Sequence, residues 1–172
     1  KNVLKANNLE NFAKGERQPL GNVLLTGATG FLGIHILKEY LDTQTGKIYC
    51  LMRGHNNVPA ENRLKAMLFY YFEDAFEELF DKRIFIIQGD VTHSEPFDYL
   101  LNEPVDTVIN CAANVKHFSK GTDIEDVNIG GVKNIIAYCL RTQARMIHIS
   151  TMSVGGMSVN GYPKPGTAMT EQ

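Results

Sequence analysis

The chain has no surplus of positive charge and no long apolar run. Its 172 residues include 17 lysines and arginines against 19 aspartates and glutamates, which gives a formal net charge of −2. A protein that binds nucleic acid needs a basic face or stripe, so this balance argues against nucleic acid as a partner. No apolar run reaches the ~18 residues of a membrane span, and no signal peptide is recognisable at the start. The sequence therefore predicts neither a nucleic-acid nor a membrane partner.

Cysteine is scarce as well. The chain contains only Cys50, Cys111 and Cys139, and each lies inside an apolar run. They form no Cys-x-x-Cys pair and no cluster with histidine, which argues against a metal site. We therefore predict buried thiols, no metal, and a reducing compartment, the cytoplasm.

The length of the chain suits one domain with a sizeable core. It opens on Lys1 rather than Met, so we expect a segment of something longer. Residues 1–21 are polar and weakly patterned, and we interpret them as an incoming linker with one short helix around Val3 to Phe12. Residues 22–172 then form the predicted folded domain.

The most informative stretch couples a short apolar run to three glycines. Val23 to Thr26 favours a strand, and Gly27, Gly30 and Gly33 follow as G-x-x-G-x-x-G, directly before an apolar helical pattern. A strand that turns sharply into a helix aims free N–H groups and the positive dipole end at one point, where a pyrophosphate binds best. Gly27 would allow the tight turn, Gly30 the approach of the phosphates, and Gly33 close helix packing. Chance glycines in an ordinary strand–loop–helix unit are the alternative.

Predicted strands and helices alternate along the rest of the chain. We expect strands over residues 23–26, 47–52, 84–87, 107–110 and 146–149. We expect helices over residues 31–41, 60–80 and 122–140, and a short helix or turn over residues 97–101. The last helix begins with a capping-box pattern, Thr122-x-x-Glu125. Strands that alternate with helices form a parallel sheet covered on both faces, and right-handed crossovers favour the strand order 3-2-1-4-5. We therefore predict a doubly wound α/β domain of Rossmann type, with its ligand crevice beyond the carboxyl ends of strands one and four.

An arginine occupies the position where a site for NAD carries an acidic residue. In such a site the end of the second strand supplies an Asp or Glu for the ribose 2′-hydroxyl, about 20 residues beyond the glycines. Here that position holds Arg53, and no acidic residue follows until Glu61. A guanidinium suits a 2′-phosphate and gains nothing from a hydroxyl, so we predict NADPH as the cofactor. Arg63 is a candidate second phosphate partner; a solvated surface charge is the alternative for both arginines.

Other predicted strand ends also carry small or polar residues. Asp90 follows the third strand, where it could accept from an adenine amino group or simply begin a turn. Ala112 and Ala113 end the fourth, where small side chains would let ribose and nicotinamide lie against the backbone; a tightly packed strand end has a similar sequence. Asn128, inside the last helix, either contacts the site or faces solvent.

Hydroxyl groups follow the fifth predicted strand in Ser150-Thr151-x-Ser153. A hydroxyl at the mouth of the crevice could donate to a carbonyl whose oxygen gains negative charge as a hydride arrives. We favour Thr151 as the catalytic residue among the three; a turn cap is the alternative.

Together these motifs resemble an extended short-chain dehydrogenase/reductase, and more narrowly the thioester reductase domain that ends some non-ribosomal peptide synthetases. Carboxylic acid reductases, aminoadipate reductase and fatty acyl-CoA reductases are related to that group. The resemblance covers residues 22–171. It rests on Thr26-Gly-Ala-Thr-Gly-Phe-Leu-Gly33, Cys50-Leu-Met-Arg53, Gly89-Asp90-Val-Thr92, Asn110-Cys-Ala-Ala113, Asn128-x-x-Gly131 and Ile149-Ser-Thr-x-Ser-Val154.

The resemblance implies NADPH-dependent release of an acyl or peptidyl thioester as an aldehyde or alcohol. The implied partner is an upstream carrier protein with its phosphopantetheine-linked substrate, to which residues 1–21 would lead. Thr151 matches the family's catalytic Thr or Ser. The implied cofactor-binding residues are Thr26, Gly27, Thr29, Gly30, Phe31, Leu32, Gly33, Arg53, Arg63, Asp90, Val91, Ala112, Ala113, Asn114, Asn128 and Ser150.

The family's catalytic Tyr-x-x-x-Lys pattern is missing. None of the seven tyrosines has a lysine four places later, and Tyr162-Pro-Lys164 has the wrong spacing. In the family this pattern comes some tens of residues beyond Thr151, so we expect truncation before it and before the substrate lobe, and no activity from these 172 residues alone. A nucleotide-sugar epimerase or dehydratase and a non-catalytic NADP-sensing module are the alternatives. Arg53 argues against the first of these where NAD is retained.

Overall fold

The computed structural model describes residues 18–54, 58–115 and 121–151. The chain divides into two units, one formed by residues 20–148 and the other by residues 1–19 and 149–172. The larger unit contains all the helices and strands given below. The helix expected around Val3 to Phe12 and the hydroxyl of Ser153 lie outside the described residues.

A five-stranded parallel sheet in the order β3-β2-β1-β4-β5 forms the centre of the larger unit. Its strands are β1 (Val23–Thr26), β2 (Ile48–Met52), β3 (Ile84–Gln88), β4 (Thr107–Asn110) and β5 (Arg145–His148). Leu25 of β1 pairs with Cys50 on one side and with Ile109 on the other. Every residue of β1, β2 and β4 is buried, as expected for parallel strands covered on both faces. The predicted Rossmann-type fold and strand order are confirmed.

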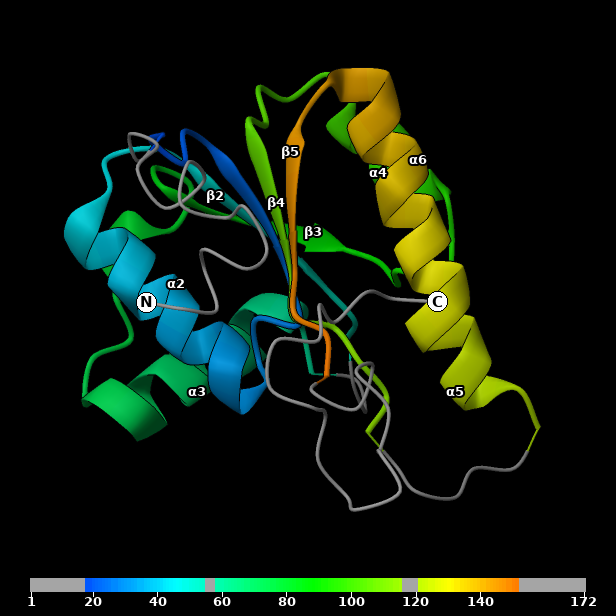
Figure 1. Cartoon of the computed structure of the whole chain (residues 1–172). Helices are drawn as coiled ribbons and strands as arrows, with labels where there is room; N and C mark the ends of the chain where they lie inside the picture. Colours follow the sequence, from blue (N-terminus) through cyan, green and yellow to red (C-terminus); the bar gives the residue numbers. More distant parts are fainter. Residues whose placement is uncertain (1–17, 55–57, 116–120, 152–172) are drawn as a thin grey trace, which may run out of the picture. The chain divides into compact units, whose positions relative to one another are not determined.

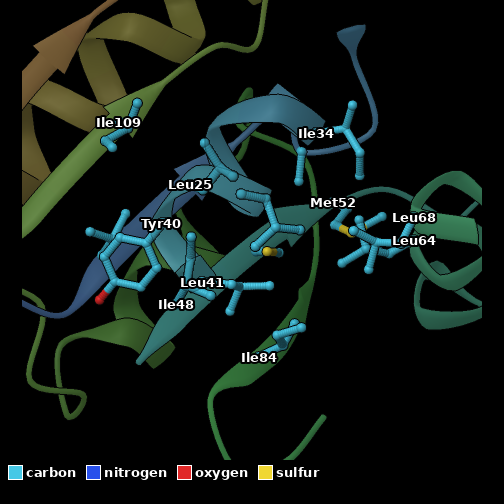
Figure 2. Close-up of a cluster of buried hydrophobic side chains, with 14 of the residues drawn as sticks. Leu25, Ile34, Tyr40, Leu41, Ile48, Met52, Leu64, Leu68, Ile84 and Ile109 are labelled. Carbon is cyan, nitrogen blue, oxygen red and sulfur yellow. The ribbon is translucent and has the colours of Figure 1, made fainter. Parts of the chain in front are cut away.

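Helices α2 (Phe31–Thr43) and α3 (Ala60–Phe72) cover one face of this sheet, and α4 (Glu95–Leu100) and α6 (Val132–Thr142) cover the other (Figure 1). On the first face, Ile34 of α2 and Leu64 and Leu68 of α3 share an apolar cluster with Leu25 and Ile84 of the sheet, as Figure 2 shows. All five side chains are fully buried. The burial of each such side chain stabilises the fold by roughly 1.5–3 kcal/mol, so this layer fixes the strand ends that surround the site.

A second apolar cluster joins α4 and α6 to the opposite face. Phe97 of α4 and Ile135 and Tyr138 of α6 pack with Leu24 and Val108 of the two central strands. Alternate residues along β1 therefore enter different clusters, which is the period-two pattern of a strand buried on both faces.

The helix predicted over residues 60–80 is shorter than expected. α3 ends at Phe72, because Glu73 and Phe76 adopt left-handed backbone conformations with φ of 59° and 52°. The carboxylate of Asp74 accepts from the N–H of Phe76 at 2.8 Å and stabilises this turn, which leads into the short 3-10 helix η1 (Glu77–Leu79). The turn contains no glycine or proline, so no helix stop signal could be recognised in the sequence.

The helix predicted over residues 122–140 is divided into three parts. They are α5 (Asp123–Glu125), the π-helical segment η2 (Asp126–Gly131) and α6. The predicted capping box is wrong, because the hydroxyl of Thr122 donates to the carboxylate of Asp126 at 2.8 Å. A Cβ atom on Gly131 would lie 2.8 Å from Cγ2 of Val91, so the glycine lets this segment pack close to the end of β3. π-Helical turns of this kind are frequent at functional sites.

None of the helices in the described residues has both the length and the apolar character that crossing a membrane requires. Within those same residues, no three His, Cys, Asp or Glu side chains gather where they could hold a metal ion.

Candidate functional site

The carboxyl ends of β1 to β4 surround a pocket of about 280 Å³. In a parallel sheet whose strand order reverses at β1, a crevice forms outside the strand ends at that point. The pocket therefore lies where the strand order places it. It is lined by Gly27, Ala28, Thr29, Gly30, Leu51, Met52, Arg53, Arg63, Gly89, Asp90, Val91, Cys111, Ala112, Ala113 and Val127.

The three glycines of the turn between β1 and α2 differ in their surroundings. Gly27 has a positive φ of 72°, and a Cβ on it would meet the backbone of Cys111 and Ala112 at 2.7 Å. A Cβ on Gly33 would lie 2.2 Å from the carbonyl oxygen of Gly27. Both positions therefore require glycine for the fold itself. Gly30 is different, because a Cβ there would approach only the carbonyl oxygen of Gly27, at 3.2 Å.

Gly30 is also the N-cap of α2, and it has no side chain that could cap the first N–H groups of the helix. The first turn of a helix leaves its N–H groups without intrahelical partners, and the positive dipole end lies at the same place. The turn thus offers a compact anion site beside a glycine that lines the pocket. Such a site suits a pyrophosphate.

Two charged residues that the sequence placed at the site contact each other. Nη1 of Arg53 lies 3.4 Å from Oδ2 of Asp90, while Oδ1 of Asp90 accepts from the N–H and the hydroxyl of Thr92, both at 3.0 Å. Burial acts to raise the pKa of Asp90, but the Thr92 hydrogen bonds and the Arg53 charge together lower it. The carboxylate is therefore ionised at neutral pH. The Arg53 side chain remains 70% exposed, so an anion in the pocket can reach its guanidinium.

Arg63 approaches the same part of the pocket from α3. Its Nη1 donates to the backbone carbonyl of Arg53 at 2.7 Å, and both arginines line the pocket. The sequence left open whether Arg63 is a phosphate partner or a surface charge. The structure places both arginines in the lining of the pocket near the end of β2, which favours binding of a dianion there.

The π-helical segment brings Asn128 to the loop that follows β4. Its Oδ1 accepts from the N–H of Asn114 at 2.8 Å, and its Nδ2 donates to the carbonyl of Asn114 at 3.0 Å. One side-chain amide therefore satisfies both backbone groups of a residue that directly follows Ala112 and Ala113. From the sequence, Asn128 was expected either to contact the site or to face solvent. The structure shows that its amide holds the backbone of Asn114 through these two hydrogen bonds, which we call the Asn128 clamp.

Asn128→Asp is expected to destabilise the domain by about 0.5–1.5 kcal/mol, because a carboxylate oxygen would replace the donor that faces the carbonyl of Asn114. Urea unfolding of wild type and variant measures the difference. Asn102→Asp, at an exposed position, is the matched control. Equal stability of the two variants would contradict the clamp.

Some of the residues that the resemblance implied lie around the pocket rather than in its lining. The side chain of Thr26 is fully buried, and its hydroxyl donates to Oδ1 of Asn110 at 2.5 Å. Phe31 and Leu32 are exposed on the first turn of α2. Ser150 and Thr151 belong to the smaller unit, so their place at the crevice stays a prediction.

Sequence reasoning missed several lining residues. Leu51 and Met52 end β2 and Cys111 follows β4, so their positions at strand ends could have indicated them. Val127 enters the lining through the π-helical segment, which no sequence signal announced. Burial raises the pKa of the Cys111 thiol to about 11, so it presents a neutral S–H group at neutral pH. Cys50 and Cys139 are buried, as predicted, whereas Cys111 is only partly buried, because it lies in the pocket lining beyond the end of β4.

Comparison with known proteins assigns the chain to a family. The model of an NAD-binding family described as male sterility protein matches residues 25–168. The chain belongs to this family. Its fold is thus that of a domain that binds a nicotinamide cofactor.

Two relatives of this chain are much longer proteins, a reductase and a synthetase. The carboxylic acid reductase of Mycobacterium tuberculosis is 31% identical over 145 residues, which are 77% of this chain and 12% of that protein. The isonitrile lipopeptide synthase of the same organism is 30% identical over 156 residues, 82% of this chain and 6% of that protein.

Among solved structures, the thiolation-reductase di-domain of an archaeal non-ribosomal peptide synthetase is 44% identical, with a TM-score of 0.82. The match covers 92% of this chain and 34% of that one. The chain therefore spans about a third or less of each of these three relatives. The resemblance to reductase domains that the motifs indicated is confirmed.

Proposed function

We propose that this domain binds NADPH and takes part in the reductive release of a carrier-bound acyl or peptidyl thioester as an aldehyde or alcohol. The observation that carries the cofactor choice is Arg53 in the pocket lining, at the end of β2, with Arg63 beside it. The printed names of the relatives, a carboxylic acid reductase and a thiolation-reductase di-domain, support the reaction class.

The residues present fit this cofactor. The open position at Gly30 and the uncapped start of α2 would hold the pyrophosphate, while Arg53 and Arg63 would hold the 2′-phosphate. Ala112 and Ala113 expose backbone at the end of β4, where a ribose and nicotinamide would find little side-chain bulk. The bound cofactor would supply a hydride to the thioester carbonyl carbon.

Thr151 would donate a hydrogen bond to the carbonyl oxygen as that oxygen gains negative charge. The tetrahedral adduct then collapses, the C–S bond breaks, and the carrier's thiol leaves with a proton. The proton donor and the residue that orients the ribose would be the Tyr and Lys of the family pattern, whose spacing does not occur in these 172 residues. We therefore assign the full reaction to the longer protein and cofactor binding to this chain.

Arg53→Ala is expected to raise the Kd for NADPH by about 10- to 100-fold, because one charge-assisted pair contributes about 1.5–3 kcal/mol. The Kd for NADH, which has no 2′-phosphate, should change little. Titration of both reduced cofactors by fluorescence measures these constants. Arg141→Ala removes the same charge from an exposed ion pair with Asp98 and is the matched control. Equal affinity of the wild type for NADPH and NADH would contradict the assignment.

The reaction itself is tested with the longer protein that contains this domain. Loss of the reduced-nicotinamide absorbance should require a carrier-bound or CoA-type acyl thioester and should not occur with a nucleotide sugar. Turnover of a UDP-sugar instead would identify an epimerase or dehydratase. NADPH binding without turnover of any thioester would identify a sensing module.

A further inference from the structure

Three neighbouring strands carry a row of polar side chains at their carboxyl ends. Thr26 of β1 pairs in register with Asn110 of β4, and Asn110 pairs with His148 of β5. Thr26 and Asn110 are fully buried, and Thr107 is the only other polar side chain buried to this degree in the described parts of the chain. A buried polar side chain persists when its hydrogen bonds are satisfied, so the partners of Asn110 show what the row does.

The backbone fixes the orientation of the Asn110 amide. Its Oδ1 accepts from the hydroxyl of Thr26 at 2.5 Å and from the N–H of Ala112 at 3.2 Å. A backbone N–H can only donate, so a flipped amide would set two donors against each other. Nδ2 of Asn110 therefore faces β5, where it lies 3.0 Å from Nδ1 of His148.

That contact determines the state of the imidazole. The amide Nδ2 can only donate, so Nδ1 of His148 must accept, and the ring proton must lie on Nε2 of a neutral side chain. We propose that His148, as the neutral Nε2–H tautomer, is a positioning residue that holds the Asn110 amide and, through it, the backbone of Ala112 in the cofactor pocket.

The position of Ala112 matters because the glycine turn lies against it. A Cβ on Gly27 would meet the N atom of Ala112 at 2.7 Å, so the backbones of the two pocket segments are in close contact. The N–H of Ala112 also lies 3.3 Å from Oγ1 of Thr26, the last residue of β1. The row thus sets the spacing between the turn that would hold the pyrophosphate and the strand end that would hold the nicotinamide. This consequence rests on the proposed function.

The first test reads the tautomer in the 172-residue chain without cofactor. Long-range ¹H–¹⁵N NMR spectra in mildly alkaline solution should show the Nε2–H form of His148. In Asn110→Asp the new carboxylate can only accept at the position of Nδ2, so the proton should move to Nδ1. An Nδ1–H tautomer in the wild type would overturn the proposal.

The second test uses two amide substitutions that differ only in reach. His148→Asn places a carbonyl oxygen near the position of Nδ1 and should bind NADPH almost as the wild type does. His148→Gln places its amide near the position of Nε2 and should, like His148→Ala, raise the Kd about fivefold, as expected for one lost hydrogen bond. Equal affinities of the Asn and Gln variants would overturn the positioning role. A wild type that binds no NADPH would overturn the proposed function, while the tautomer spectrum would still decide the role of His148.

Discussion

Gly30→Val should abolish measurable NADPH binding while the domain remains folded. Gly30 has φ −76° and ψ 160°, an extended conformation that β-branched residues favour. A Cβ there meets only one backbone atom, the carbonyl oxygen of Gly27 at 3.2 Å, which has to shift by a few tenths of an ångström. The branched side chain would, however, occupy the part of the pocket beside the turn, where we propose that the phosphates bind. We expect the Kd to rise at least about 100-fold, equivalent to ~2.7 kcal/mol.

Calorimetric titration with NADPH and circular dichroism together measure this effect. Gly130→Val adds the same side chain at a position outside the pocket lining, where a Cβ would have only one backbone neighbour, at 4.0 Å, and it should bind as the wild type does. Gly33→Ala should instead destabilise the fold, because its Cβ would lie 2.2 Å from the carbonyl oxygen of Gly27. Unchanged affinity in a folded Gly30→Val variant would show that the phosphates bind elsewhere.

Thr151→Ala should lower turnover of the longer reductase by about 100-fold or more and leave its affinity for NADPH nearly unchanged. A hydrogen-bond donor that faces an oxygen only as its charge develops stabilises the transition state more than the ground state. Thr151→Ser keeps the hydroxyl and should restore most of the rate. Single-turnover absorbance of the reduced nicotinamide, with a carrier-bound or CoA-type thioester, measures all three proteins.

The 172-residue chain by itself is expected to bind the cofactor without turning it over. It should bind NADPH and fail to oxidise it with any acyl thioester, because general acid catalysis contributes about 10²–10⁴-fold and the positioned ribose contributes further. Rapid consumption of NADPH by this chain would mean that the proton donor lies within residues 1–172. Full turnover by Thr151→Ala in the longer protein would remove Thr151 from the mechanism.

The ion pair between Arg53 and Asp90 bears on the proposed preference for NADPH over NADH. An exposed ion pair at 3.4 Å contributes little to stability, so Arg53 remains available to a 2′-phosphate. Asp90 nevertheless keeps a negative charge beside that guanidinium, held by two hydrogen bonds from Thr92. The pocket therefore combines an exposed cation with a hydrogen-bonded anion at the ends of two adjacent strands.

The sequence by itself determined the architecture of the sheet and the location of the pocket. Apolar runs separated by amphipathic segments specify buried parallel strands, and the near-universal handedness of crossovers leaves one natural strand order. Because the carboxyl ends of parallel strands all lie on the same side of the sheet, the residues that follow the strands must lie close together. Arg53, Asp90 and Ala112 were found in this way, and all three line the pocket.

Tertiary structure alone decided how the side chains pair within this frame. The left-handed turn at Glu73 has no local signal, and the π-helical segment that brings Asn128 to Asn114 looks like ordinary helix in the sequence. Likewise, the row from Thr26 to His148 joins residues from three strands that are far apart in the chain. Periodicity reports which face a residue occupies, but hydrogen-bond partners depend on strand register and on backbone groups from distant segments, and these exist only once the sheet has formed.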